Sequence, residues 1–223
     1  MRRSWYWSYG KRILDLLLAL TGLFILSIPL LITIGIGVII QGRPVFFRQT
    51  RIGRHGKPFA IWKLRTMHRC KPHESTITVS GDARITRWGR FLRRFKLDEL
   101  PQLFCVLRGT MSFVGPRPDV PGYWDRIQPD DRWLLDLRPG ITGPASLVFR
   151  DEESLLAGQK DPISFNDSVL FPQKVRLTRR YADELGLFSD LKWILWTCLP
   201  GAALAARLDT SGWIAFPSSK EKK

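Results

Sequence analysis

The chain has 223 residues, of which 44% are hydrophobic, and it carries a formal net charge of +15. This length allows one or two domains with a modest hydrophobic core. The positive charge indicates an anionic partner, such as membrane lipid, nucleotide phosphate or nucleic acid. The three cysteines lack metal-ligand spacing, which argues against a disulfide framework and against a zinc site.

Residues 13–42 form an apolar segment that contains a single charge, Asp15. The segment exceeds the ~20 residues that a helix needs to span a bilayer. Basic residues flank both ends, and such flanks prefer the cytoplasmic side of a membrane. Pro29, two residues after Ser27, bends or breaks a helix because it lacks a backbone donor. Two alternatives remain open: a kinked transmembrane helix, or a re-entrant hairpin that enters one leaflet and returns, which the flanks favour.

The elements after this segment are predicted from periodicity and turn signals. Residues 44–49 and 58–67 are typical of two short strands joined as a hairpin. A polar loop is expected over 69–82. Residues 85–96 combine apolar positions at helical spacing with many arginines, which predicts an amphipathic helix in the headgroup plane or, alternatively, a soluble core helix with a charged face.

The second half of the chain is predicted to be mostly helical. It is nearly neutral, with 16 Lys and Arg against 17 Asp and Glu from residue 97 onward. The predicted features are helices over 101–107, 124–137, 151–156 and 171–185, an extended connector at 115–118, a turn-rich loop at 138–144, and an apolar stretch at 191–206 that is interrupted at Pro200.

A pair of carboxylates, Asp98 and Glu99, directly follows the most basic part of the chain. Residues 43–96 contain 15 Lys and Arg but only two acids. Nearby cations favour ionised carboxylates, and an ionised Asp can attack phosphorus while a second carboxylate holds Mg²⁺. The alternative is structural: Asp98 would cap the following helix, with Glu99 in its first turn.

Three cations are candidates for binding phosphate oxygens: Lys63, Arg93 and Arg117. Each one alone is also compatible with a solvated surface charge. The sequence has no Gly-rich phosphate loop of the Walker or dinucleotide type, so nucleotide binding would depend on side chains and other loops.

Several short strings occur in order along nearly the whole chain. They are Lys11-Arg12-Ile-Leu-Asp15, Gln49-x-Arg51-x-Gly53-x-x-Gly56, Trp62-Lys63-Leu-Arg65-Thr-Met67, Asp82-x-Arg84-Ile-Thr-Arg87, Leu97-Asp98-Glu99-Leu-Pro101, Met111-Ser-Phe-Val-Gly-Pro-Arg117-Pro118, Arg138-Pro-Gly-Ile-Thr-Gly143 and Asp190-Leu191-Lys192. This ordered set is highly specific and resembles the bacterial sugar transferase family, the small monotopic phosphoglycosyl transferases.

The resemblance implies a reaction and roles for the site residues. The family moves a sugar phosphate from a UDP-sugar to a polyprenyl phosphate such as undecaprenyl phosphate and releases UMP, which starts the assembly of a surface glycan. Asp98 matches the nucleophile that forms a phosphosugar–enzyme intermediate, and Glu99 matches its partner, thought to bind Mg²⁺. Arg93 and Arg117 match active-site arginines, while Lys63 is a weaker match.

The resemblance also implies a membrane helix broken near Ser27 and Pro29, so that the protein enters only the cytoplasmic leaflet of the bacterial inner membrane. The expected fold class is α+β and mostly helical. A re-entrant helix hairpin with a basic and aromatic flank would occupy residues 1–42. A small cytoplasmic catalytic domain with a short β-hairpin and interfacial helices would occupy 43–210, and a flexible tail 211–223.

The sequence departs from the family pattern at three places. Ile28 separates Ser27 from Pro29, Thr110 replaces an acid, and Cys105 replaces an asparagine. The segment from Arg150 to Glu153 follows one branch of the family, where a role in sugar recognition is only a hypothesis.

The expected partners are a UDP-sugar, polyprenyl phosphate and membrane lipid, without nucleic acid. A rival prediction from another class is a non-catalytic, membrane-attached protein that binds anionic lipid or nucleic acid. A metal-dependent phosphatase is a third. The sequence does not identify the sugar, the glycan or the oligomeric state.

Overall fold

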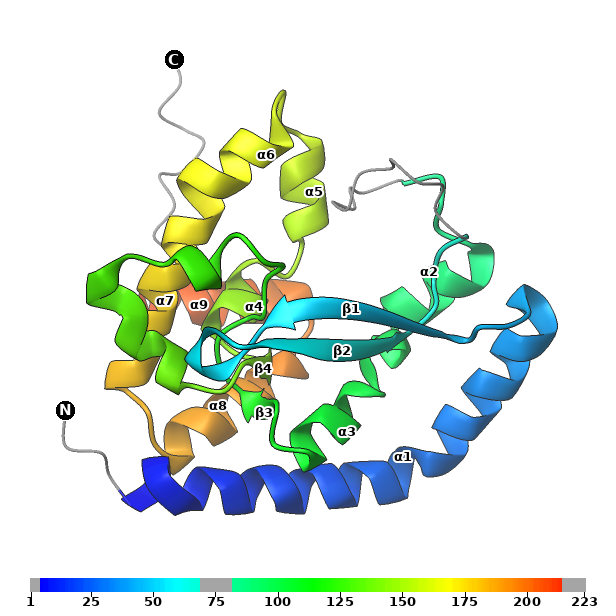
Figure 1. Ribbon diagram of the computed structural model, residues 1–223, viewed down its shortest axis with the longest axis horizontal. Coiled ribbons are helices and arrows are strands. Elements are labelled where there is room, and N and C mark those ends of the chain that lie inside the picture. Colours follow the sequence, from blue (N-terminus) through cyan, green and yellow to red (C-terminus); the bar gives the residue numbers. More distant parts are fainter. Residues whose placement is uncertain (1–4, 69–81, 214–223) are drawn as a thin grey trace.

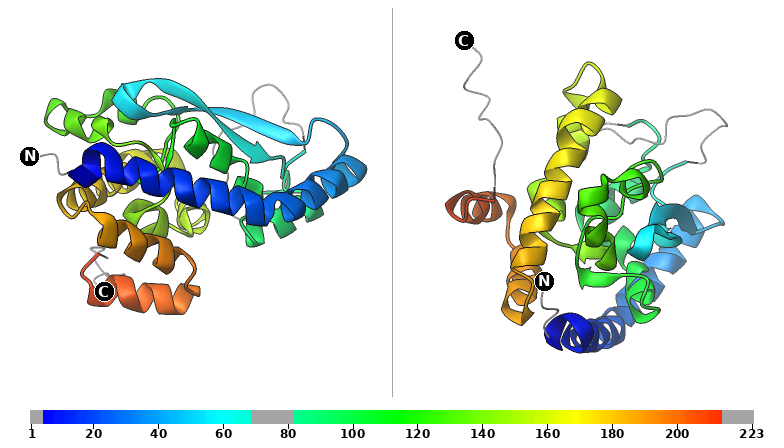
Figure 2. Two further views of the ribbon diagram at one scale, coloured as in Figure 1. Left: turned by 90° about the horizontal axis from the view of Figure 1, so that it is seen from below. Right: turned by 60° about the vertical axis from the view of Figure 1, so that its left-hand side comes forward.

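The computed structural model describes residues 5–68 and 82–213, and these form a mostly helical α+β fold (Figure 1). A short π-helical turn, η1 (Tyr6–Gly10), leads into the long helix α1 (Lys11–Gln41). Figure 2 shows α1 crossing the whole width of the molecule along one side. Within the described residues, η1 and α1 form the one helix that is long and apolar enough to cross a membrane.

Helix α1 is bent but not interrupted, so the expected break at Ser27 and Pro29 is instead a bend within one continuous helix (Figure 1). Pro29 removes one backbone hydrogen bond and its ring crowds the preceding turn. Two hydroxyls add to the distortion: Ser27 donates to the Phe24 carbonyl at 2.8 Å and Thr33 donates to the Pro29 carbonyl at 2.6 Å. Such bonds to the preceding turn bend helices.

Polar side chains fix the first turns of α1 to the rest of the fold. Lys11 donates to Asp190 at 2.6 Å, and Arg12 donates to the carbonyls of Val106 and Leu107 at 2.6 and 2.8 Å. Asp15, the lone charge in the apolar segment, is buried and accepts from the Ser112 hydroxyl and the Phe113 backbone N–H. The charges at this end therefore act as anchors, whereas most of α1 beyond them exposes apolar side chains, such as Phe24 at 83%.

The predicted hairpin is confirmed. Strands β1 (Phe46–Ile52) and β2 (Pro58–Leu64) pair antiparallel, with Phe46 opposite Leu64. Helix α2 (Arg87–Arg94) is the predicted cationic helix. It is capped by Thr86, whose hydroxyl accepts from the Gly89 N–H at 2.8 Å. A Cβ at Gly89 would lie 1.9 Å from the Thr66 carbonyl oxygen, so only glycine lets α2 pack this closely on the chain after β2.

A second, parallel pair of strands was not predicted. Strand β3 (Ser112–Val114) pairs with β4 (Gly140–Thr142), with Ser112 opposite Gly140. Three-residue strands are too short to show a period in the sequence. Between α2 and β3 the chain forms a 3₁₀ turn, η3 (Leu97–Glu99), and the predicted short helix, α3 (Gln102–Leu107).

The expected α-helix over 124–137 is wrong. This segment contains two 3₁₀ stretches, η4 (Trp124–Arg126) and η5 (Pro129–Asp136). Gln128 between them has ψ 148°, because the residue before a proline is driven out of the helical region.

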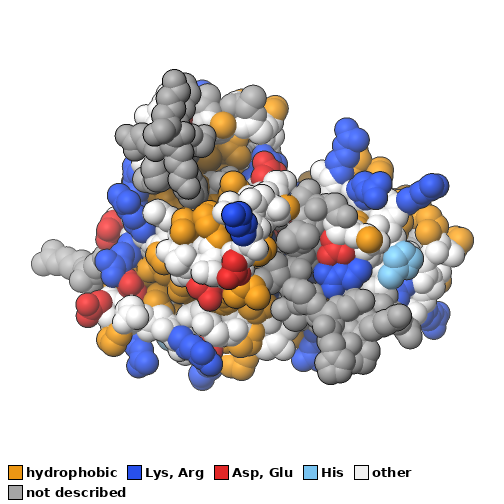
Figure 3. All heavy atoms as spheres, turned by 90° about the horizontal axis from the view of Figure 1, so that it is seen from above, with side chains coloured by type: hydrophobic (Ala, Val, Ile, Leu, Met, Phe, Trp, Pro, Cys, Tyr) orange, Lys and Arg blue, Asp and Glu red, His pale blue; other side chains and the backbone are white. Residues whose placement is uncertain are grey.

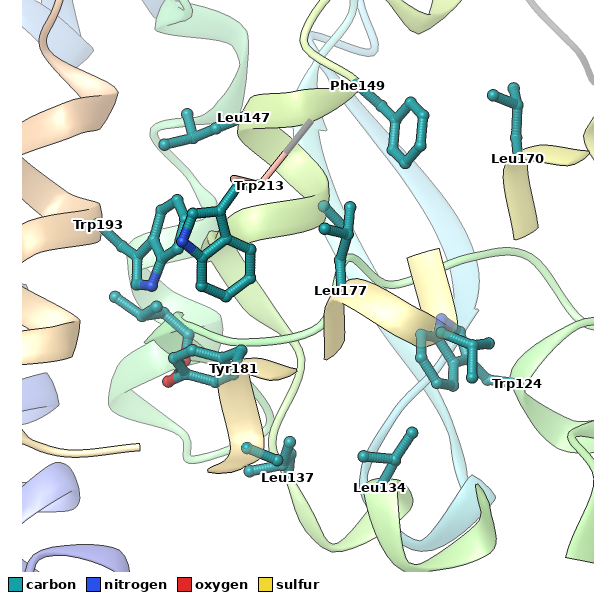
Figure 4. Packing of buried hydrophobic residues seen from close by; sticks show 14 of the residues in the cluster. Trp124, Leu134, Leu137, Leu147, Phe149, Leu170, Leu177, Tyr181, Trp193 and Trp213 are labelled. Carbon is teal, nitrogen blue, oxygen red and sulfur yellow. Dashed lines mark hydrogen bonds between the residues drawn. The ribbon is translucent and has the colours of Figure 1, made fainter. Parts of the chain in front are cut away.

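The C-terminal helices build the main core. They are α4 (Pro144–Val148), α5 (Glu152–Ala157), α6 (Pro162–Phe165), the π-helical turn η6 (Asn166–Leu170), α7 (Phe171–Asp183), α8 (Leu187–Thr197) and α9 (Gly201–Thr210). The expected interruption at Pro200 is confirmed between α8 and α9. Trp193 and Trp213 meet edge-to-face with ring centroids 4.7 Å apart, beside Tyr181 (Figure 4). Most of the expected tail and loop (211–223 and 69–82) lies outside the described residues, although Trp213 is buried.

Candidate active site

The two predicted carboxylates lie in the turn between α2 and α3. Lys96 adopts a left-handed conformation with φ 56°, which reverses the chain and starts η3 with Asp98 and Glu99. Helix α3 has Pro101 at its N-cap and no side-chain cap bond. Asp98 therefore does not cap that helix, and the structural alternative for this residue is wrong.

Asp98 is buried, at 7% exposure, and its Oδ1 atom has no hydrogen-bond partner in the described part of the chain. Burial raises the pKa of Asp98 above its ordinary value, and the charge of Lys63 opposes this shift without cancelling it. The sequence showed the neighbouring cations but not the desolvation, which is the larger effect on the pKa of Asp98.

Glu99 has the opposite electrostatic environment. Lys63 on β2 donates to Glu99 Oε1 at 2.7 Å. Burial raises the pKa of Glu99, but the charge and hydrogen bond of Lys63, together with the charges of Arg117 and Lys96, outweigh it and bring the pKa to about 2. Glu99 is therefore ionised at neutral pH, and the two adjacent acids differ because only one of them is paired.

The two predicted arginines are held by other side chains. Arg93 donates to the Thr66 hydroxyl at 3.0 Å and to Glu153 at 3.0 Å. Arg117 Nε lies 3.6 Å from Glu152. Burial lowers the pKa of Arg117, but the neighbouring carboxylates, Glu152 foremost, outweigh it and raise the pKa above its ordinary value.

Each of the three predicted cations acts electrostatically on at least one of the two predicted carboxylates. Lys63 and Arg93 favour the ionised form of Asp98, and Lys63 and Arg117 favour that of Glu99. Basic side chains are spread over the upper face of the molecule, with acidic side chains between them, and do not gather into one patch (Figure 3). Close to the two carboxylates, however, Lys63, Arg93 and Arg117 supply positive charge, which suits a diphosphate.

Four further residues of this region were missed. Arg51 on β1 donates to the Pro118 carbonyl at 3.2 Å, and Lys174 on α7 bonds Asp119 and Glu152. Arg51 lies in one of the family strings, which was a usable signal. A lysine in a charged helix gives no sign that it is buried, and Asp119 and Glu152 lie far along the chain from the acid pair.

The two departures from the family pattern near α3 bond to each other. Thr110 donates its hydroxyl to the Cys105 carbonyl at 3.0 Å, and the Cys105 side chain is buried against the Ala60 carbonyl. They support the turn after α3.

The described residues contain no group of three or more His, Cys, Asp or Glu side chains able to hold a metal ion. The donor set still fits one use of Mg²⁺, which is commonly held by one or two carboxylates together with substrate phosphates. The ionised Glu99 supplies such a carboxylate.

The apolar helix and the acid pair among cations together define a membrane-associated protein with a site suited to phosphate transfer. The chain belongs to the bacterial sugar transferase family, whose model matches residues 6–202. It is accordingly an enzyme of the sugar-phosphate transferase type.

Several bacterial relatives match most of the chain. It is 35% identical over 182 residues to the uncharacterized sugar transferase EpsL of Bacillus subtilis, covering 82% of each chain. It is 38% identical over 195 residues to the UDP-glucose:undecaprenyl-phosphate glucose-1-phosphate transferase of Caulobacter vibrioides, covering 84% of this chain and 67% of the relative. The Escherichia coli protein of the same name is 35% identical over 198 residues, covering 86% of this chain and 40% of the relative.

Proposed function

We propose that this enzyme transfers a sugar-1-phosphate from a UDP-sugar to polyprenyl phosphate, with Asp98 as the nucleophile and UMP as the first product. The single observation that carries the proposal is the Asp98 Oδ1 atom, buried without a hydrogen-bond partner among the described residues and flanked by cations. The names of the relatives, which include undecaprenyl-phosphate sugar-1-phosphate transferases, support the substrate classes.

The reaction would proceed in two displacements at one phosphorus atom. Asp98 attacks the phosphorus that carries the sugar, an aspartyl-phosphate bond forms, and the bond to the bridging oxygen breaks to release UMP. A polyprenyl phosphate oxygen then attacks the same phosphorus and releases the carboxylate. Arg93 and Arg117 bind the phosphate oxygens, and Lys63 keeps Glu99 ionised.

Glu99, with the diphosphate oxygens, would hold Mg²⁺, which when bound would neutralise negative charge on the phosphates. The low pKa of Glu99, about 2, suits this role because a metal ligand must be deprotonated.

The topology we propose is re-entrant, with the catalytic part on the cytoplasmic face. Its support is that both ends of α1 bond to the same folded unit. Lys11 binds Asp190 at one end, while at the other end Arg65 donates to the Gly42 carbonyl at 3.0 Å and Gln41 donates to Thr86. In a background without native cysteines, single cysteines at positions 3 and 54 should be labelled from the same side of the membrane. Labelling from opposite sides would mean a true span.

The activity is tested by UMP release from a panel of UDP-sugars with Mg²⁺ and polyprenyl phosphate. The wild type should release UMP with at least one sugar in a ping-pong pattern, and Asp98→Ala should not. Mass spectrometry after reaction without the lipid acceptor should find the phosphosugar on Asp98. Attachment to another side chain would refute the nucleophile.

The same assay separates the two rival functions. A wild type that releases no UMP with any sugar would favour a non-catalytic binding protein. Free sugar phosphate formed without the lipid acceptor would favour a phosphatase.

A further inference from the structure

A chain of alternating charges lies behind Arg117. Glu152, at the start of α5, has one carboxylate oxygen 3.6 Å from Arg117 Nε and the other 2.9 Å from Lys174 Nζ. Lys174 also lies 3.2 Å from Asp119 Oδ1. The order of the chain is therefore arginine, glutamate, lysine and aspartate.

The middle of this chain is enclosed in the protein. Lys174 is 1% exposed, so its ammonium group depends on the two carboxylates in place of water. Asp119 is fixed in turn because its backbone carbonyl accepts from the Ile52 N–H at 3.0 Å, at the end of β1. With α7 on one side and the end of β1 on the other, Glu152 has little freedom to move.

Arg117 is the solvent-exposed end of this chain of charges. Its side chain is 39% exposed, and its charge acts on Glu99. Its backbone carbonyl accepts from the Trp124 indole at 3.0 Å, which fixes the main chain but not the guanidinium group. Glu152 is the one carboxylate that an ion pair within the described residues places against that group.

We propose that Glu152 is a positioning residue that aims Arg117 at the substrate diphosphate, and that buried Lys174 and Asp119 hold Glu152 in place. The proposal rests on the proposed function, since it gives Arg117 a diphosphate to bind. It assigns a role to the acidic segment after Arg150 that is distinct from sugar recognition. Arg93 offers a contrast, because its partner Glu153 is 49% exposed and pairs with no second cation among the residues that the structure describes.

A purely structural role for Glu152 makes a different prediction, and a double-mutant cycle separates the two. Glu152→Gln in the wild-type background should lower kcat/KM for the UDP-sugar by a factor on the order of 10², the effect of a misplaced binding group. In an Arg117→Ala background, Glu152→Gln should change kcat/KM by less than about threefold, because no arginine remains to be aimed. Equal losses in both backgrounds would overturn the proposal.

A matched control is Glu184→Gln, since Glu184 is also a glutamate paired with an arginine, Arg180, at 3.1 Å, but in an exposed pair that includes none of the site residues. Its kcat/KM should equal that of the wild type. If Glu152→Gln does not fold, Glu152→Asp takes its place in the cycle, because it keeps the charge and shortens the reach.

The two proposals fail in distinguishable ways. A wild type that releases no UMP with any UDP-sugar refutes the proposed function. An active wild type in which Glu152→Gln, with unchanged thermal unfolding, retains full kcat/KM refutes the positioning role alone. Binding of UMP supplies a second readout, and we expect Glu152→Gln to weaken it about as much as Arg117→Ala does.

Discussion

Two lysine–carboxylate pairs of nearly equal length have different environments. Lys11 and Asp190, at the start of α1, lie 2.6 Å apart with side chains 9% and 1% exposed, and Lys63 and Glu99 lie 2.7 Å apart with side chains 25% and 24% exposed. Both oxygens of Asp190 are occupied, because Oδ2 also accepts from Tyr6 and Oδ1 accepts from Tyr181.

Beside the Lys63–Glu99 pair, the neighbouring acid is not fully hydrogen-bonded. Asp98, adjacent to Glu99, keeps an oxygen without a hydrogen-bond partner among the described residues. The buried pair joins distant elements, and we expect the partly exposed pair to be the one that substrate can reach. Four predictions test this distinction, from the largest expected effect to the smallest.

Lys11→Met should lower the free energy of unfolding by about 3–5 kcal/mol, because it leaves the Asp190 charge buried without its cation. Thermal and denaturant unfolding in detergent measure the effect. Lys11→Met combined with Asp190→Asn should recover part of the loss. A single variant as stable as the wild type would mean that the pair does not anchor α1.

Lys63→Met should reduce the acid sensitivity of folding. The pKa of Glu99 falls from 4.5 to about 2 in the folded protein, so its contribution is complete above pH 4.5 and is lost as the pH falls toward 2. That contribution is at most about 3 kcal/mol. The difference in unfolding free energy between pH 7 and pH 3 should therefore be smaller in Lys63→Met, whereas Lys192→Met, which breaks a more exposed pair with Glu184, should behave as the wild type.

Asp98→Asn should abolish UMP release and slightly stabilise the fold at pH 7, because it removes a desolvated charge. The pKa of Asp98 is raised, so its ionisation opposes folding at neutral pH and ceases to do so below its ordinary value of 3.8. The gain should hence disappear below about pH 4. A variant less stable than the wild type at pH 7 would indicate that Asp98 is structural.

Glu153→Gln should change the free energy of unfolding by less than about 1 kcal/mol, since its ion pair with Arg93 is exposed. It frees Arg93 from a competing carboxylate, so KM for the UDP-sugar should fall, at most a few-fold. A large rise in KM would instead assign Glu153 to substrate binding.

The sequence predicted the parts of this molecule that depend on local patterns. The hairpin followed from two apolar runs around Gly53 and Gly56, the cationic helix from its helical spacing, and the interruption of the C-terminal apolar stretch from Pro200. The acid pair and the three cations were chosen from composition and from the family resemblance, and their roles stay predictions. The prediction of one helix over 124–137 was wrong because Pro129 drives Gln128 out of the helical region. Pro129 is visible in the sequence and should have predicted this interruption.

Other features had no local signal. The parallel pairing of β3 and β4 joins strands of three residues that are 25 or more positions apart. The contribution of α5 and α7 to the site depends on Glu152 and Lys174, which lie more than 50 residues from Glu99 along the chain.

By itself, the sequence determined which chemical groups this protein has and where the apolar helix lies, since residue type and periodicity are local properties. Only the tertiary structure decided which charges are saturated and which are left open. Burial and ion pairing depend on distances between segments far apart in the chain. Burial raises the pKa of Asp98, whereas neighbouring cations, Lys63 foremost, lower that of Glu99, although the two residues are adjacent in the sequence.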